Sequence, residues 1–230
     1  MTNTLQSPKV RAVLDRLFED AARDGENGPD IDAGTWSTAT PRQLADACQA
    51  IYMPISEPGG RLLYALTRAA RPATVVEFGT SYGISTAYLA AAVTDNGAVT
   101  DNGAVTDNGA GRVLTTELSP VKIAAAQANL EQAGLADVVT VLAGDALETL
   151  SGVLEPVGLL FLDGWKDLCL PVLRLLEPRL APGALVVADD VDSHASMADY
   201  LGYVRDPANG YVSIAFPVED GMEVSCWTGA

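Results

Sequence analysis

Positive charge and cysteine are both scarce in this chain. Lys and Arg number 14 against 30 acidic residues, which gives a formal net charge of −16. A nucleic-acid partner needs concentrated positive charge, so the composition argues against one. The cysteines, Cys48, Cys169 and Cys226, are far apart and lack the spacing of metal ligands. This pattern is typical of unpaired thiols in a reducing compartment.

Long apolar runs are also absent. No stretch approaches the roughly 18 residues of a membrane helix, and the charged residues 1–20 lack the apolar core of a signal peptide. We therefore expect no membrane partner and a cytoplasmic location. Hydrophobic residues still make up 48% of the 230 residues, enough for the core of one sizeable domain.

Short apolar runs alternate with helical patterns from residue 74 onward. Such alternation predicts a parallel sheet with helices on both faces. The expected strands cover residues 74–78, 112–117, 138–144, 157–163 and 184–190. The expected helices between them cover residues 84–93, 119–134, 145–152 and 167–180. Runs at 210–218 and 222–229 predict a terminal antiparallel hairpin.

Helices are expected ahead of the sheet as well. Apolar residues recur at helical spacing over 10–18, and Thr40-Pro41 is typical of an N-cap followed by proline at the first helical position. A third helix is expected over 60–70. The apolar face of these helices suggests a homodimer contact.

The first expected strand leads into a glycine turn, in "VVEFGTSYGISTAYLA". Gly79 and Gly83 bracket a turn that enters a helix near Ile84. Such a turn lets a ligand approach the backbone closely, although a turn that simply needs two glycines is the alternative. The spacing departs from G-x-G-x-x-G, which disfavours a nicotinamide dehydrogenase. Glu77 before the turn would repel a pyrophosphate and suits a ligand with an amino group.

Acidic residues end the next strands. Glu117 ends the second strand. In many open α/β sheets, an acidic residue at this place binds ribose hydroxyls. Asp145, after the third strand, could meet an adenine amino group or cap the next helix. Each residue alone could be solvated surface, but together they favour a nucleoside ligand.

Three further aspartates, Asp163, Asp189 and Asp190, end the fourth and fifth strands. Neighbouring strand ends lie ~5 Å apart, so these carboxylates could share one hard cation such as Mg²⁺. That ion could hold both oxygens of a vicinal diol or phenol. Surface aspartates at helix starts are the alternative.

These motifs resemble those of class I S-adenosylmethionine methyltransferases. "VVEFGTSYGISTAYLA", "TTELS" and "AGDA" are similar to the cofactor motifs, and "LFLDGWKD" with "VVADDV" resembles the catechol and caffeoyl-CoA O-methyltransferase group. The resemblance begins near Met53 and runs to the terminal hairpin. It implies an α/β fold with a Rossmann-like seven-stranded methyltransferase sheet, mostly parallel with an antiparallel C-terminal hairpin. One methyltransferase domain would span 1–230, with an N-terminal helical extension over 1–52 and the cofactor-binding and catalytic core over 53–230.

The resemblance implies methyl transfer from S-adenosylmethionine to a phenolic hydroxyl of a small molecule, assisted by Mg²⁺. Lys166 would be the catalytic base, and Met53 and Trp165 would contact the substrate. The metal ligands would be Asp163, Asp189 and Asp190. Cofactor contacts are expected from Ile55, Glu77, Gly79, Ser81, Gly83, Ser85, Glu117, Asp145, Ala146 and Asp163.

Lys166 suits a base on chemical grounds as well, because a lysine beside an ion pocket loses its proton more readily than one in water. His194, with an ordinary pKa of ~6.5, is the alternative base. The chain departs from the group at three places: Asp189-Asp190 replaces an Asp-Asn pair, Gly164 leaves more room, and Ile214 stands near a glutamate of the catechol enzymes. A larger or bicyclic phenol is therefore plausible.

Two other functions stay open, a metal-independent small-molecule methyltransferase and a non-catalytic S-adenosylmethionine-binding scaffold. One more feature is a hexamer, TDNGAV, repeated from Thr94 to Gly111. We interpret residues 94–111 as a duplicated turn in a surface loop at the amino end of the sheet. A cation site made by Asp95, Asp101 and Asp107 is the alternative.

Overall fold

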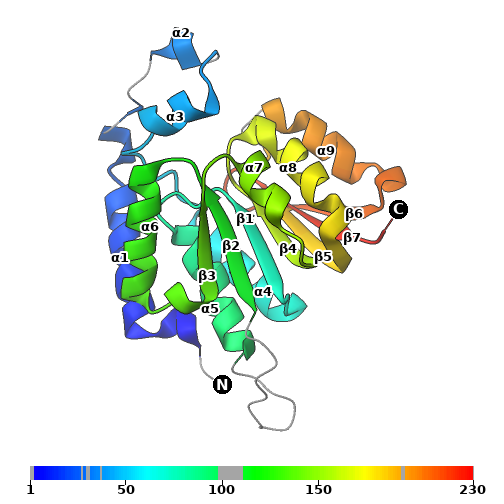
Figure 1. The fold of residues 1–230 in the computed structure, drawn as a ribbon, viewed down its shortest axis with the longest axis horizontal. Coiled ribbons are helices and arrows are strands. Elements are labelled where there is room, and N and C mark those ends of the chain that lie inside the picture. Colours follow the sequence, from blue (N-terminus) through cyan, green and yellow to red (C-terminus); the bar gives the residue numbers. More distant parts are fainter. Residues whose placement is uncertain are drawn as a thin grey trace.

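Seven strands form one sheet in the order β3-β2-β1-β4-β5-β7-β6. The protein's structure is a computed structural model that describes residues 3–26, 28–29, 32–36, 38–97, 111–192 and 195–229. Figure 1 shows the sheet running through the centre of the molecule. The strands are β1 (Thr74–Phe78), β2 (Arg112–Glu117), β3 (Val139–Ala143), β4 (Val157–Leu162), β5 (Leu180–Ala188), β6 (Tyr211–Phe216) and β7 (Met222–Trp227).

Strands β1 to β5 are parallel, whereas β7 pairs antiparallel with both β5 and β6. The predicted sheet and its terminal hairpin are thus confirmed, although β5 begins at Leu180, four residues before the predicted residue 184. From β1 the chain proceeds to β2 and β3 on one side of the sheet and then crosses to β4 and β5 on the other side, so the strand order reverses between β1 and β4. Ligands of open α/β sheets bind at the carboxyl ends of the strands beside such a reversal.

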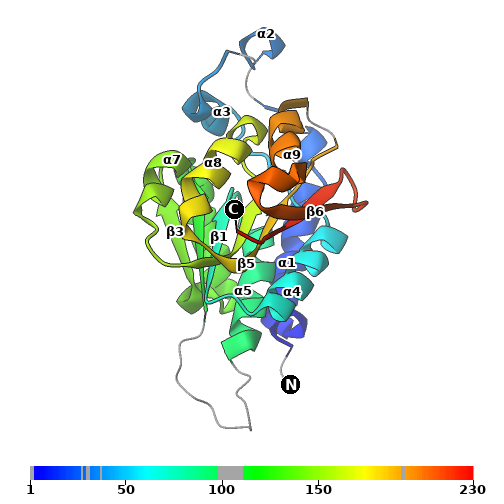
Figure 2. The same ribbon diagram turned by 90° about the vertical axis from the view of Figure 1, so that its right-hand side faces the viewer.

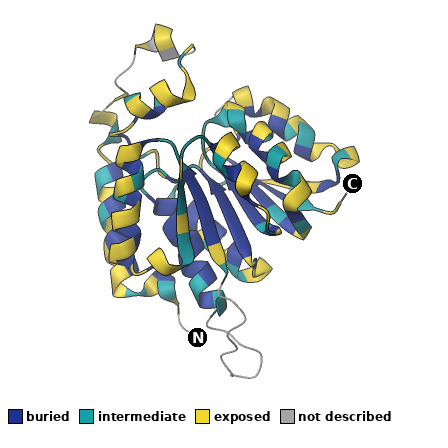
Figure 3. Ribbon diagram, in the orientation of Figure 1, coloured by how far each residue is buried: buried dark blue, intermediate teal, exposed yellow. Residues whose placement is uncertain are grey.

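Helices cover both faces of the sheet (Figures 1 and 2). One face packs α1, α4, α5 and α6 against side chains such as Val75 and Val113, and the other packs α8 and α9 against the alternate positions, such as Val76 and Leu114. Figure 3 shows that the central strands are buried almost throughout. The helices are α1 (Pro8–Ala21), α2 (Ala33–Trp36), α3 (Pro41–Ala47), α4 (Glu57–Ala70), α5 (Ile84–Gly97), α6 (Pro120–Ala133), α7 (Ala146–Thr149), α8 (Cys169–Leu176) and α9 (Ala198–Arg205).

The N-terminal helices begin where the sequence indicates. Thr40 and Gln43 form a capping box at the start of α3, with Pro41 at the first helical position. The apolar face of α1 is buried in the same core as α5, and the homodimer expected from the N-terminal helices stays a prediction. Helix α9 was not predicted. No helix of the described ranges is long and apolar enough to cross a membrane.

The first four residues of the first repeat unit, Thr94–Gly97, belong to a helix, which corrects this part of the loop predicted over 94–111. Helix α5 continues to Gly97, and Asp95 is 1% exposed. Its carboxylate accepts hydrogen bonds from the Thr4 hydroxyl and the Tyr64 hydroxyl, both at 2.6 Å. Asp95 therefore anchors the N-terminal segment. Residues 98–110, with the other two aspartates of the proposed cation site, lie outside the described residues.

Candidate active site

A cavity of about 620 Å³ opens at the carboxyl ends of β1, β2 and β4. This volume is within the usual range for a small-molecule site. Residues 39–55, the β1–α5 turn, the β2–α6 loop and the segment after β4 form its wall. The predicted site residues that line it are Met53, Ile55, Gly79, Ser81, Ser85, Glu117, Asp145, Ala146, Asp163, Trp165, Lys166 and Asp190.

The β1–α5 turn requires its glycines. Gly79 has a φ of +105°, and a Cβ there would lie 2.6 Å from the carbonyl oxygen of Asp163. Gly83 has a φ of +87° but is not part of the cavity wall, so it serves the backbone of the turn. Because the end of β1 approaches the end of β4 closely, the β1–α5 turn and Asp163 lie side by side in the cavity wall.

Glu77 lies behind the cavity wall. Its carboxylate accepts hydrogen bonds from the hydroxyls of Ser85 and Thr115, both at 2.6 Å, and from Thr86. Burial raises the pKa of Glu77 to about 7, against the opposing effect of these hydrogen bonds. Only Ser85 of this group lines the cavity. Ser85 therefore connects Glu77 to the cavity, and direct contact of Glu77 with the cofactor stays a prediction.

Glu117 is held in a fixed orientation at the end of β2. Its Oε1 accepts hydrogen bonds from the backbone N–H groups of Leu118 and Ser119, each at 2.8 Å, and its Oε2 accepts one from Ser81 at 2.9 Å. Asp145 caps α7 through the N–H of Leu147 at 2.8 Å. The capping prediction is confirmed for Asp145. Its contact with adenine stays a prediction, as does the ribose contact of Glu117.

The three aspartates at the ends of β4 and β5 meet, as predicted. Asp163, Asp189 and Asp190 each offer one carboxylate oxygen, and these oxygens lie within 4.8 Å of one another. Burial and the two neighbouring carboxylates raise the pKa of Asp189 to about 8. Oxygen ligands crowded in this way fit a hard divalent cation, which would offset their mutual repulsion.

Lys166 lies between two of these carboxylates. Its Nζ is 2.9 Å from Asp163 Oδ1 and 3.1 Å from Asp190 Oδ2. Burial alone would lower the pKa of Lys166, but Asp163 and Asp190 outweigh it and raise the pKa well above the ordinary value. These two carboxylates stabilise the ammonium form, and the base role expected for Lys166 beside a bound cation stays a prediction. His194 lies outside the described residues.

Two of the expected departures from the family have a different meaning in the structure. A Cβ on Gly164 would lie 2.4 Å from the ring of Phe78, so the phenyl ring already fills the space that we expected Gly164 to leave. Ile214 is 61% exposed on β6 and is not among the residues that line the cavity. Gly164 itself lines the cavity, whereas Ile214 does not.

Sequence reasoning missed the part of the wall that precedes Met53. Leu44, Cys48 and Tyr52 line the cavity although they lie before the start of the family resemblance. Lys122 in the first turn of α6 was missed too. It is 4% exposed, its Nζ lies 5.8 Å from the centroid of the Tyr82 ring, and burial lowers its pKa. Tyr52 directly precedes Met53 in the chain, whereas Lys122 comes to Tyr82 and the cavity through contacts distant in sequence.

The sheet order, the glycine turn and the acids at the ends of β2 and β3 define a class I methyltransferase fold. The methyltransferase domain family matches residues 76–191. The catechol O-methyltransferase of Mycobacterium tuberculosis is 31% identical over 174 residues, 72% of this chain and 73% of that protein. The catechol O-methyltransferase of Mus musculus is 28% identical over 191 residues, 77% of this chain and 66% of that protein.

Solved structures agree on the fold. The O-methyltransferase of Bacillus cereus in complex with SAH superposes with a TM-score of 0.63 at 21% identity, covering 92% of this chain and 99% of that chain. The chain therefore belongs to the S-adenosylmethionine-dependent O-methyltransferases. This membership sets aside the non-catalytic scaffold.

Proposed function

We propose that this enzyme methylates a phenolic hydroxyl of a small molecule and that a divalent cation assists the transfer. The observation that carries the proposal is the meeting of three carboxylates, of which Asp163 and Asp190 line the cavity beside Lys166. Several relatives are named catechol O-methyltransferases, which supports a phenolic acceptor.

Asp163, Asp189 and Asp190 would hold the cation, for which Mg²⁺ is the natural choice given an all-oxygen ligand set. A bound Mg²⁺ polarises an acceptor hydroxyl and lowers its pKa of roughly 10 toward neutrality. Lys166 pairs with two of these carboxylates, those of Asp163 and Asp190.

Lys166 would receive the acceptor's proton at its Nζ. With the carboxylates free, Asp163 and Asp190 keep the ammonium protonated. Carboxylates that are neutralised by a cation stabilise the ammonium less, so the base form of Lys166 becomes accessible. The proposed base role therefore depends on the proposed metal.

Methyl transfer is an in-line displacement, so alignment of the acceptor oxygen matters as much as its charge. Trp165 and Met53 line the same cavity, and Met53 is 46% exposed. We propose that Trp165 packs against the aromatic ring of the acceptor and that Met53 borders the reacting groups. An acceptor larger than catechol remains part of the proposal.

A metal-independent reaction is the second candidate. The observation in its favour is that Lys166 already pairs with two of the three carboxylates. In that case the ammonium would stay protonated and help to stabilise a phenolate electrostatically.

A methyl-transfer screen distinguishes these candidates. It would compare catechols, hydroxycinnamates and polycyclic phenols with S-adenosylmethionine, in Mg²⁺ and in EDTA. Turnover that requires Mg²⁺ supports the first proposal, and equal turnover in EDTA supports the second. No methylation of any phenol would refute the acceptor class. A homodimer is a separate proposal, and solution scattering that gives a monomer would refute it.

A further inference from the structure

The segment Tyr52–Met53 is an unusual part of the cavity wall. Met53 has a φ of +44°, in the left-handed region that residues with a side chain rarely adopt. Both residues line the cavity. A conformation of this kind persists only where its surroundings hold it, and it often marks a functional position.

Asp24, in the turn after α1, holds this segment through its backbone. The N–H of Tyr52 lies 2.8 Å from each carboxylate oxygen of Asp24, and the N–H of Met53 lies 2.8 Å from Oδ2. Two successive N–H groups that converge on one anion form a strong, charge-assisted interaction. Asp24 thus accepts hydrogen bonds from the N–H of the strained residue, Met53, and from the N–H of Tyr52 before it.

The segment Tyr52–Met53 also contacts the β1–α5 turn, which holds the expected cofactor residues Gly79 and Ser81. The hydroxyl of Ser81 donates to the carbonyl oxygen of Tyr52 at 2.6 Å, and the rings of Tyr52 and Tyr82 stack with their centroids 3.9 Å apart. Ser81 also donates its N–H to Glu117, the proposed ribose ligand. The position of Tyr52–Met53 is therefore coupled to the part of the wall that faces the cofactor.

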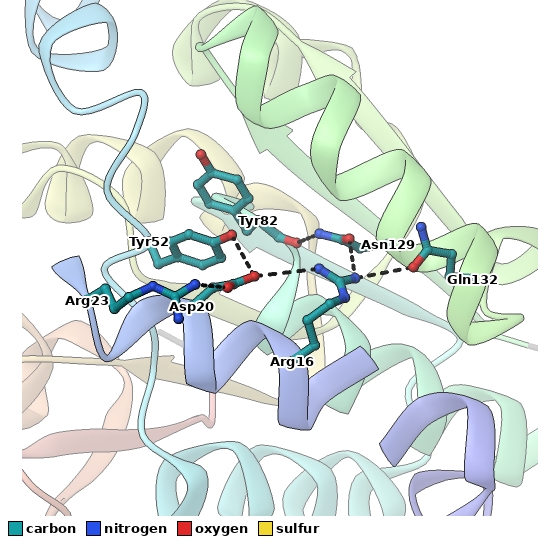
Figure 4. Close-up of polar contacts among 7 residues, drawn as sticks. All are labelled: Arg16, Asp20, Arg23, Tyr52, Tyr82, Asn129 and Gln132. Carbon is teal, nitrogen blue, oxygen red and sulfur yellow. Dashed lines mark hydrogen bonds and ion pairs between the residues drawn. The ribbon is translucent and has the colours of Figure 1, made fainter. Parts of the chain in front are cut away.

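Helix α1 supports this arrangement from below (Figure 4). Arg16 donates to the side chain of Asn129 at 2.9 Å, and Asn129 donates to the carbonyl oxygen of Tyr82 at 2.9 Å. Asp20 accepts a long hydrogen bond of 3.4 Å from the Tyr52 hydroxyl. These contacts hold the Tyr52 hydroxyl and the Tyr82 backbone, whereas Asp24 accepts from the backbone N–H groups of Tyr52 and Met53.

We propose that Asp24 is a positioning residue for cofactor binding, which it promotes by keeping Tyr52–Met53 in the binding-competent conformation. The proposal rests on membership of the S-adenosylmethionine-dependent enzymes and not on the acceptor or the metal. Loss of the anchor lowers the fraction of molecules in the competent state, and the apparent Kd rises by the inverse of that fraction.

The test measures S-adenosylhomocysteine binding by calorimetry in EDTA without acceptor, so its outcome is independent of the phenol and metal proposals. Asp24→Asn removes the charge and one acceptor oxygen, and we expect the Kd to rise about tenfold. Asp24→Glu restores the charge and should recover part of the affinity. Asp15→Asn, an exposed position on α1, is the matched control and should stay within about twofold of the original Kd.

Three results overturn the proposal. The first is an Asp24→Asn protein that binds as tightly as Asp15→Asn. The second is a variant with a lower Tm and an unchanged Kd, which indicates a purely structural role. The third comes from the unaltered protein and so does not depend on how a variant folds. The hydrogen bonds to Asp24 should protect the Tyr52 and Met53 amides from hydrogen exchange. Exchange of these amides at the rate of free amides would contradict the proposed role of Asp24.

Discussion

Lys166 pairs with two carboxylates, so its replacement tests the electrostatics of the cluster directly. We expect Lys166→Met in EDTA to lower the free energy of unfolding by about 3 kcal/mol. Most of this loss comes from the pair with Asp163, whose two side chains are 10% and 12% exposed. The pair with Asp190, whose carboxylate is 38% exposed, adds under about 1 kcal/mol.

The value lies at the low end of the roughly 3–5 kcal/mol for a broken buried ion pair, because Asp163 can take up a proton when Lys166 is absent. Burial already raises the pKa of Asp163 above its ordinary value, although Lys166 opposes the shift. For a chain of this size, the loss corresponds to a fall in Tm of about 6–12 °C.

Thermal unfolding with and without Mg²⁺ is the assay. Saturating Mg²⁺ should restore most of the Tm of Lys166→Met, because the cation replaces the ammonium among the carboxylates. Turnover should stay at least about 100-fold below that of the unaltered enzyme, because the base is missing. Lys9→Met, at an exposed position on α1, is the control and should leave the Tm within about 1 °C.

Two outcomes would refute this reasoning. An unchanged Tm for Lys166→Met in EDTA would show that the ion pairs contribute nothing. A fall in Tm that Mg²⁺ does not reverse would show that the cation and Lys166 do not share the cluster.

Three further predictions concern other parts of the site and the repeat. The raised pKa of Glu77, about 7, means that its contribution to stability is fully present below its ordinary pKa and is lost as pH rises through about 7. Ionised Glu77 attracts the cationic cofactor, so calorimetry should show tighter binding at pH 8 than at pH 6, and the same pH dependence in Glu77→Gln would contradict this. Gly79→Ala forces a Cβ to 2.6 Å from a backbone oxygen, so it should weaken cofactor binding more than about tenfold. The control is Gly152→Ala, whose Cβ meets nothing within 4 Å and which should leave cofactor binding unchanged. Equal Kd values for the two variants would refute the close approach at Gly79. Deletion of residues 94–105 brings an identical Thr-Asp-Asn-Gly unit to the end of α5, so kcat/KM should stay within about twofold. A large loss of activity in the deletion variant would show that the repeat reaches the site. Asp95→Ala, in contrast, removes the acceptor of the Thr4 and Tyr64 hydrogen bonds and should lower the Tm by about 4–8 °C.

The sequence predicted the carboxylate cluster because strand order alone brings its members together. Asp163 follows β4 and Asp189 follows β5, and neighbouring parallel strands end at the same edge of the sheet. The capping box of α3 was predictable for a similar reason, since its signal lies within four residues.

The remaining features depend on contacts between distant segments. Alternation along β1 places Glu77 on the same face as buried Val75, which indicates burial, but its hydroxyl partner Thr115 is 38 residues away. The pairing of Asp24 with Tyr52 spans 28 residues and involves only a backbone donor, so no side-chain pattern could indicate it. The sign of the Lys166 pKa shift likewise required the distances to both carboxylates.

The most direct test of the central claim is the rate of catechol methylation as Mg²⁺ is titrated into metal-stripped enzyme. The account predicts a rate at least about 100-fold lower in EDTA than in saturating Mg²⁺, with saturable recovery and full S-adenosylhomocysteine binding throughout. Catechol turnover that is equally fast in EDTA would contradict it.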